Sequence, residues 1–132
     1  NGQEITLLNA RRAGEIPHLQ VLSEVKRAGI VASPSLYEPF GLAALEGARA
    51  GAALVLSDIP TYRELWGGAA IFFAPHDAGA LAHAVNRLAS DSGLRNELAA
   101  RALARSRRFT PDIQAGRMAE LYRELVDRPM AA

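Results

Sequence analysis

Residues 30–60 read IVASPSLYEPFGLAALEGARAGAALVLSDIP. Two short apolar runs in this stretch, residues 30–33 and 53–56, are typical of strands that are buried on both faces of a sheet. Between them, residues 42–50 have the small and apolar side chains of a packed helix, and Gly51 suits its end. A strand, a helix and a second strand in this order predict a parallel pair joined by a helical crossover.

The same alternation continues on both sides of this stretch. Two further apolar runs, at residues 5–8 and 70–73, are predicted strands. The other helices are predicted from Pro17 to Gly29, from an Asp58 cap to Trp66, from an Asp77 cap through Leu88, from a Ser92 cap to Phe109, and from Thr110 and Pro111 to Val126. We therefore expect an α/β fold, a Rossmann-like doubly wound parallel sheet of about four strands followed by C-terminal helices.

Composition limits the classes of function. The chain has 132 residues, enough for one domain with a core. It has no cysteine, which excludes disulfides, thiolate catalysis and cysteine-based zinc sites. No apolar run approaches the roughly 20 residues that span a bilayer. A net charge of +1 gives no support for nucleic-acid binding. The chain begins at Asn1 rather than methionine, and we expect it to be a fragment of a longer protein.

The loop between the strand at 30–33 and the next helix carries the candidate chemistry. Backbone N–H groups at Phe40, Gly41 and Leu42 have no partners in the coming helix, and the positive end of the helix dipole lies there. Such a position suits a phosphate or another oxyanion. Glu38 lies in the loop and Glu46 lies further along the helix, and ionised carboxylates accept hydrogen bonds from paired sugar hydroxyls.

Other interpretations of these residues stay open from the sequence alone. Glu38 also suits a solvated loop residue, and Glu46 an exposed helix residue. The domain as a whole also suits a non-catalytic nucleotide- or phosphate-binding module, or an α/β protein-interaction module. A non-catalytic module would keep Gly41 and tolerate the loss of Glu38.

The motif around these residues resembles a known family. Glu38 and Glu46 frame an E-x7-E pattern that contains Phe40-Gly41 and follows Pro34-Ser35; Ser57-Asp58-Ile59-Pro60 comes later. From about Ile5 to Leu125, the chain resembles the C-terminal, nucleotide-sugar-binding domain of a retaining GT-B glycosyltransferase of family 4, the group 1 transferases. The whole chain, residues 1–132, would then be part of that donor-binding domain.

The resemblance implies an activity and a set of site residues. It implies transfer of a hexose from a nucleotide diphosphate sugar to an acceptor with retained configuration. Glu38 would be the catalytic residue that contacts the hexose, and Glu46 would bind the ribose. The backbone at Phe40, Gly41 and Leu42 would bind the diphosphate and sugar hydroxyls, so that Glu38, Phe40, Gly41, Leu42 and Glu46 form the donor site. No metal and no cofactor are implied, which agrees with the lack of an Asp-x-Asp motif.

The resemblance also defines what this chain lacks. Family members neutralise the diphosphate with an Arg and a Lys from an earlier region, and no basic residue upstream of Glu38 lies in a matching motif. We expect the N-terminal acceptor domain to be absent and the isolated chain to be inactive. The acceptor would be a sugar, a lipid or another small molecule. The implied location is the cytoplasm, where the enzyme could also bind peripherally to the inner face of the membrane.

Four further expectations concern the surface and the packing. Arg101, Arg105 and Arg108 form one helical stripe, which is either a solvated face or a contact for anionic lipid. Trp66 is expected to pack in the core. Glu38 and Glu46 are predicted to line one cleft at the carboxyl edge of the sheet. Missing strands would leave one sheet edge or face uncovered, so we expect self-association or marginal stability.

Overall fold

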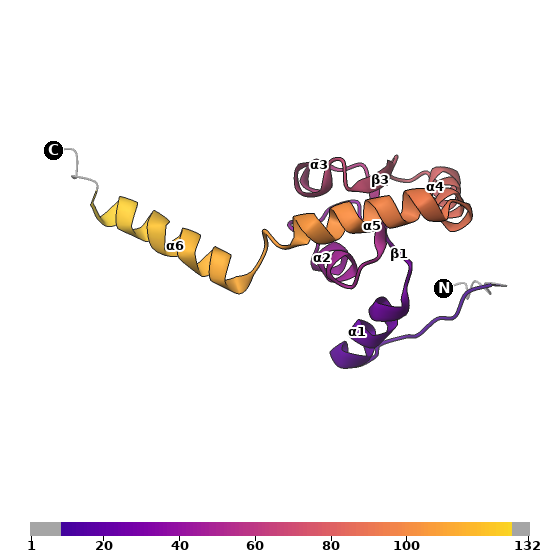
Figure 1. The fold of residues 1–132 in the computed structure, drawn as a ribbon, viewed down its shortest axis with the longest axis horizontal. Helices are drawn as coiled ribbons and strands as arrows, with labels where there is room; N and C mark the ends of the chain where they lie inside the picture. The colour runs from indigo at the N-terminus through magenta and orange to yellow at the C-terminus, as the bar shows by residue number, and fades with distance from the viewer. Residues whose placement is uncertain (1–8, 128–132) are drawn as a thin grey trace, which may run out of the picture.

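The computed structural model describes residues 9–127. The elements in chain order are α1 (His18–Arg27), β1 (Ile30–Ser33), α2 (Leu42–Arg49), β2 (Ala53–Ser57), α3 (Pro60–Trp66), β3 (Ala70–Phe73), α4 (Ala78–Ser90), α5 (Ser92–Ser106) and α6 (Pro111–Val126) (Figure 1). The predicted alternation of strands and helices is confirmed from α1 onward. The predicted strand at 5–8 lies outside the described residues.

The three strands form one parallel sheet in the order β1-β2-β3. Every residue of β2 is buried, as expected for a central strand that has helices on both faces. Because all three strands run the same way, their carboxyl ends at Ser33, Ser57 and Phe73 lie on one edge of the sheet. That edge is where ligands bind in folds of this class.

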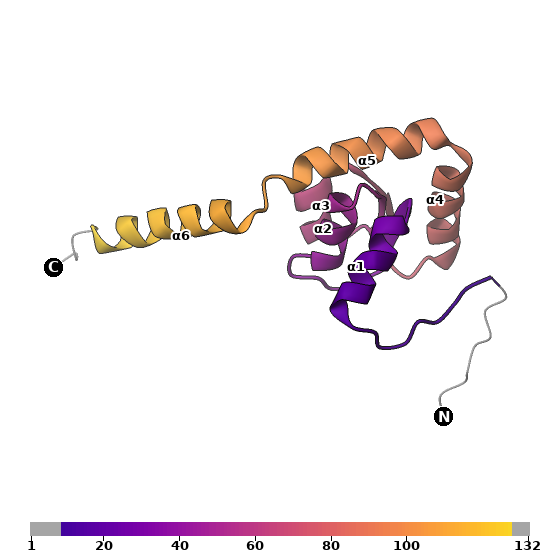
Figure 2. The same cartoon turned by 60° about the horizontal axis from the view of Figure 1, so that its bottom comes forward.

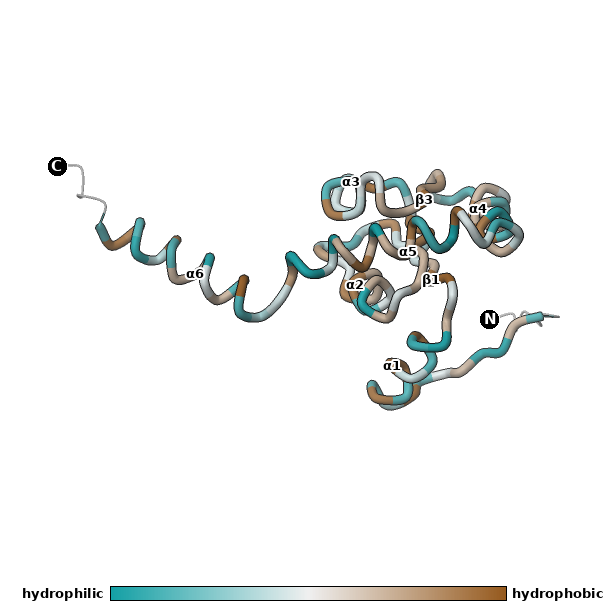
Figure 3. Tube along the Cα trace, viewed as in Figure 1, coloured by the Kyte–Doolittle hydropathy of each residue, from teal (hydrophilic) through white to brown (hydrophobic). Residues whose placement is uncertain are grey.

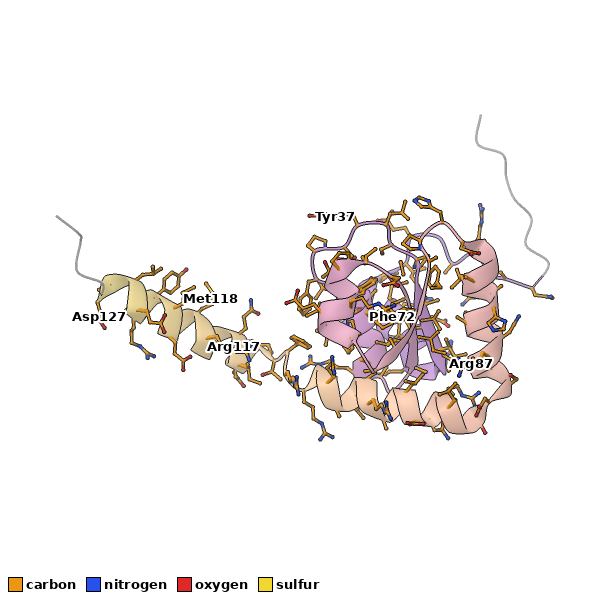
Figure 4. All side chains as sticks on the ribbon, turned by 90° about the horizontal axis from the view of Figure 1, so that it is seen from above. Tyr37, Phe72, Arg87, Arg117, Met118 and Asp127 are labelled. Atoms are coloured by element: carbon orange, nitrogen blue, oxygen red, sulfur yellow. The ribbon has the colours of Figure 1, made fainter. Side chains whose placement is uncertain are left out.

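Two hydrophobic clusters sandwich the sheet. On one face, α2 and α3 pack over Leu54 and Leu56, with Tyr62 and Trp66 fully buried among them. On the other face, α4 packs over Val55 and contributes Ala84 and Leu88. Figure 4 shows the sheet between these two helical layers. The doubly wound arrangement predicted from the apolar strands is therefore confirmed.

Helix α5 closes the amino edge of the sheet, opposite the candidate site. It adds Leu98 to one cluster and Ala102 to the other, so it bridges the two helical layers. Arg95 of α5 donates to the carbonyl of Leu88 at 2.8 Å, and its side chain lies against Gly29, the residue before β1. Figure 2 shows α5 crossing from the α4 side to the α2 side.

Helix α6 extends away from the rest of the molecule (Figures 1 and 2). None of its residues is buried. Its large apolar side chains are exposed by between 39% at Ile113 and 83% at Val126, and Figure 3 shows hydrophobic segments alternating with hydrophilic ones along it. The predicted helix is confirmed, but its apolar rows cover no part of the described domain.

The predicted helix starts are confirmed at two positions. Asp77 accepts from the Ala80 N–H at 2.8 Å and caps α4, and Thr110 accepts from the Ile113 N–H at 3.3 Å at the start of α6.

Two predicted caps are wrong, and the first helix is shorter than predicted. Asp91, rather than Ser92, caps α5 through the Leu94 N–H at 2.8 Å, because α4 leaves only one residue before α5 begins. Asp58 does not cap α3; its carboxylate instead pairs with Arg63. Helix α1 ends at Arg27, before the predicted stop at Gly29.

Candidate functional site

The candidate site lies at the carboxyl edge, in the loop from residue 34 to Gly41 that joins β1 to α2. Gly41 is the N-cap residue of α2 and has a φ of 90°, a conformation that favours glycine. A Cβ at this position would lie 2.5 Å from Cε1 of Tyr62. The missing Cβ of Gly41 also lets a ligand approach the backbone. The structure adds an intramolecular reason, since the Tyr62 ring occupies the space that a side chain would need.

Glu38 turns back onto the start of α2. Its Oε1 accepts a hydrogen bond from the Gly41 N–H at 3.0 Å and a longer one from the Phe40 N–H at 3.4 Å. The side chain is half-buried. Glu38 is therefore more than a solvated loop residue: the N–H groups of Phe40 and Gly41 bind its own carboxylate, and their binding of a ligand's oxyanion stays a prediction.

Leu42 begins the helix with an N–H group that has no intrahelical partner. The first hydrogen bond of α2 runs from the Leu45 N–H to the Gly41 carbonyl at 3.1 Å, which leaves the N–H groups of residues 42–44 outside the helical ladder. The positive end of the helix dipole therefore adjoins the Glu38 carboxylate.

Glu46 lies on the same helix, five residues after Gly41 and so about 7.5 Å further along its axis. Its side chain is 30% exposed, and its Oε1 lies 3.8 Å from Nε2 of His18 on α1. Glu46 is therefore partly covered rather than a freely exposed helix residue. Within residues 9–127, no hydrogen bond or ion pair joins Glu38 to Glu46, and their sharing of one cleft stays a prediction.

A hydroxyl network that the sequence analysis missed lies beneath this loop. The Tyr62 hydroxyl lies 2.6 Å from Oγ of Ser33, at the end of β1. Ser57, at the end of β2, donates to the carbonyl oxygens of Ser33 at 3.1 Å and Ser35 at 2.6 Å. Ser57 therefore binds the loop and does not cap α3, the helix that follows it. No local sequence pattern signals this network, because the bonds from Tyr62 to Ser33 and from Ser57 to Ser35 join residues that are 29 and 22 positions apart.

An exposed ion pair joins Asp58, which follows β2, to Arg63 on α3. Arg63 donates to both carboxylate oxygens of Asp58, at 2.5 and 2.6 Å, and its guanidinium carbon lies 4.2 Å from the centre of the Phe72 ring. The hydrogen bond and charge of Arg63 hold the pKa of Asp58 below its ordinary value, and the same hydrogen bond raises the pKa of Arg63. Both side chains of this pair are therefore ionised at neutral pH.

A groove lies between α2 and α6. It has a volume of about 660 Å³ and is lined by Phe40, Leu42, Phe109 and residues of α6. Neither Glu38 nor Glu46 lines it. The side chains of Phe40 and Leu42 therefore face this groove, and the donor role predicted for these two residues rests on their backbone.

The surroundings differ for Trp66, for Tyr37, which precedes Glu38, and for the arginine stripe on α5. Trp66 is buried, as predicted, with its ring centre 6.2 Å from that of Phe109. Tyr37 is 84% exposed and points away from the domain (Figure 4). In the stripe on α5, Arg101 donates to the Gly68 carbonyl and Arg105 to the Leu65 carbonyl. The stripe therefore holds the end of α3 and is more than a solvated face.

Residues 9–127 show no metal centre and no membrane-spanning helix. Among these residues, no group of three histidine and acidic side chains has the arrangement needed to hold a metal ion. Over the same range, no helix combines the length and the apolar composition needed to cross a membrane.

The comparisons with known proteins point in one direction. The family model described as "Glycosyl transferases group 1" matches residues 8–105. Over 104 residues the chain is 38% identical to glycogen synthase from Mycobacterium tuberculosis, and over 77 residues it is 39% identical to the serotype-specific mannosyltransferase WbdA from Escherichia coli. The first alignment covers 77% of this chain and 24% of the synthase; the second covers 58% and 9%.

The fold has a solved counterpart. Sucrose-phosphate synthase from Thermosynechococcus elongatus superposes with a TM-score of 0.77 and 29% sequence identity. The superposition covers 86% of this chain and 29% of that protein. The Rossmann-like α/β arrangement is thus that of a GT-B glycosyltransferase domain. The chain spans about a quarter of the length of the glycogen synthases that it matches.

Proposed function

This chain belongs to the group 1 glycosyl transferases, and from that premise we propose that it supplies the donor half-site of a retaining hexosyltransferase. The donor would be a nucleotide diphosphate sugar, bound at the carboxyl edge by Glu38, Glu46 and the start of α2. The acceptor, a sugar, a lipid or another small molecule, would be bound outside this chain. The proposed location is the cytoplasm, where the enzyme can also bind peripherally to the membrane surface.

One observation carries this proposal. The E-x7-E pair flanks the N-terminus of α2, where Glu38 binds the Phe40 and Gly41 N–H groups and the N–H groups of residues 42–44 lie outside the helical ladder. A diphosphate is an oxyanion of the kind that such N–H groups and the helix dipole favour. Glu46 follows within two turns of the helix, which is a suitable separation for the nucleoside that adjoins the diphosphate.

The reaction assigns a separate task to each group. The bond between the anomeric carbon and the diphosphate oxygen breaks, a bond to the acceptor oxygen forms on the same face of the sugar, and the proton of the acceptor hydroxyl passes to the departing diphosphate. Negative charge then develops on the departing diphosphate, where the N-terminus of α2 stabilises it. Glu38 would hold the hexose as its contacts tighten, and Glu46 would accept hydrogen bonds from the ribose hydroxyls.

No metal ion or cofactor takes part in this proposal. The resemblance places the diphosphate-neutralising Arg and Lys in an earlier region of the donor domain. Arg63, a basic residue of α3 near the carboxyl edge, is already paired with Asp58. We therefore propose that the 132-residue chain binds nucleotide weakly and does not catalyse transfer on its own.

The test separates the two carboxylates. Calorimetric titration of the chain with UDP, ADP and GDP should show binding of at least one of them. Glu46→Gln removes a charged acceptor and should weaken that binding by about 10- to 150-fold, equivalent to roughly 1.5–3 kcal/mol. Glu38→Gln should leave it nearly unchanged and lower kcat in the intact transferase.

Glu120→Gln, on exposed α6, is the matched control and should change neither quantity. Equal weakening by Glu38→Gln and Glu46→Gln would show that the division of roles is wrong. Binding of inorganic pyrophosphate as tight as that of the nucleotides, unaffected by either substitution, would instead indicate a non-catalytic phosphate-binding module.

A further inference from the structure

Tyr62 joins the two ends of the loop that carries Glu38. It lies on α3, after β2, and is fully buried. Its hydroxyl lies 2.6 Å from Oγ of Ser33, the residue from which the loop leaves β1. Its ring covers the Cα of Gly41, the residue at which the loop enters α2. One side chain from a different crossover therefore contacts the first and last anchor points of the loop.

The Tyr62 ring packs against Gly41, whose N–H group is one of the backbone donors at the start of α2. Since an added Cβ would come within 2.5 Å of Cε1 and 3.4 Å of Cζ and the hydroxyl oxygen, the ring and the Gly41 backbone are in close contact. The Gly41 N–H is the donor that binds the Glu38 carboxylate at 3.0 Å. A displacement of the ring would therefore move both the N–H group and the carboxylate.

The hydroxyl contact fixes the ring in turn. Ser33 is buried and also lies 3.2 Å from Oγ of Ser35. Ser57 binds the carbonyl oxygens of both serines. Buried hydroxyls are costly to leave without partners, so this network favours one orientation of the Tyr62 ring.

We propose that Tyr62 is a positioning residue of the donor site: through Ser33 and Gly41 it holds the N-terminus of α2 and Glu38 in the geometry that binds the diphosphate and the sugar. This inference rests on the proposed function. Tyr62 touches neither ligand in this arrangement and acts through the backbone of Gly41. Displacements of about 1 Å in such groups are enough to lower the efficiency of a site.

Two substitutions separate the ring from its hydroxyl. Tyr62→Leu removes the ring and should weaken nucleoside diphosphate binding by at least about 10-fold, a loss equivalent to roughly 1.4 kcal/mol. Tyr62→Phe keeps the ring on Gly41 and should rescue most of the affinity, leaving a loss of about 2- to 5-fold. Tyr122→Leu and Tyr122→Phe, on exposed α6, are the matched controls and should bind like the wild type.

The titrations are made at a temperature at which circular dichroism shows every variant to be fully folded, so a change in affinity is not a change in the folded fraction. Amide hydrogen exchange, followed by NMR, gives a second readout without ligand. The Gly41 amide should exchange at least about 10-fold faster in Tyr62→Leu, while the Val55 amide in the centre of the sheet changes less.

The two readouts give a decision in every case. A folded Tyr62→Leu variant with wild-type affinity would overturn the proposal, and so would one whose Gly41 amide exchanges at the wild-type rate. If Tyr62→Leu does not fold, Tyr62→Phe decides: faster Gly41 exchange supports positioning, and unchanged exchange and affinity overturn it. If the wild-type chain binds no nucleotide, the proposed function fails, while exchange at Gly41 still tests whether Tyr62 holds the loop.

Discussion

Helices α2 and α6 show how differently two apolar helices are used in this chain. Helix α2 has 8 residues, of which Ala44, Leu45, Gly47 and Ala48 are buried. Helix α6 has 16 residues and none is buried. The difference follows from where the chain places each helix: α2 lies on the sheet, and α6 leads away from it. Small residues let α2 approach the sheet closely, whereas the large apolar residues of α6 extend from a helix that leaves the domain. Apolar spacing therefore predicts a helix without predicting what covers it.

The largest effect is expected where α2 begins. Gly41→Ala places a Cβ at positive φ and against the buried Tyr62 ring, and should lower the free energy of unfolding by about 2–5 kcal/mol. Gly51→Ala is the matched control after the other end of α2. Gly51 has a φ of +84° and nothing within 4 Å of an added Cβ, so it should lose only about 1–2 kcal/mol. Urea denaturation measures both; equal losses would mean that the Tyr62 contact adds nothing.

Replacing a glycine in the middle of a helix by alanine should destabilise the protein in α2 and stabilise the helix in α6. In α2, a Cβ on Gly47 would lie 2.9–3.1 Å from three atoms of Val31, so Gly47→Ala should cost up to about 2 kcal/mol after its gain in helix propensity. In α6, Gly116 has nothing within 4 Å, and Gly116→Ala should stabilise the helix locally by up to about 1 kcal/mol.

Denaturation measures the loss at Gly47, and amide exchange along α6 measures the gain at Gly116. The double variant Val31→Ala, Gly47→Ala should show less than additive destabilisation, because the smaller side chain makes room for the new Cβ. Additive costs would contradict close packing of α2 on β1.

Removal of α6 should have a smaller effect on folding. Because no α6 residue is buried, ending the chain after Thr110 should change the free energy of unfolding by no more than about 1 kcal/mol.

Sedimentation velocity over a concentration series tests the expected self-association, with and without α6. Self-association that disappears with α6 would place it on the apolar rows of that helix, and self-association that persists would place it on the sheet edges predicted from the sequence.

The smallest effect is expected at the exposed Asp58–Arg63 pair. Arg63 holds the pKa of Asp58 below its ordinary value, so the pair stabilises the fold above the unfolded-state pKa of about 3.9, and this contribution is lost as the pH falls through the lowered folded-state pKa. Asp58→Asn should therefore be slightly less stable than the wild type at pH 7 and equal to it in acid. Thermal melts from pH 7 down to pH 2 compare the stability of Asp58→Asn with that of the wild type. A stability difference that grows in acid would contradict the lowered pKa of Asp58.

The sequence by itself determined the elements and the location of the candidate loop. Continuous apolar runs predicted β1, β2 and β3 because strands covered on both faces exclude polar residues, and the order of strands and helices implied parallel pairing. The E-x7-E pattern identified Glu38 and Glu46 because their spacing around Gly41 is local. Asp77 and Thr110 were identified as caps for the same reason, since a cap binds an N–H group only a few residues away.

The tertiary structure alone decided which residues hold that loop in place and which apolar helix is covered. Tyr62 contacts Ser33 and Gly41 from 29 and 21 residues away, and Ser57 binds Ser33 from 24 residues away. Such contacts depend on how crossovers pack over a shared sheet, and no periodicity in the chain encodes them. The exposure of α6 has the same origin: its spacing resembles that of a core helix, but burial requires a second surface, and the path of the chain after Phe109 leads away from one.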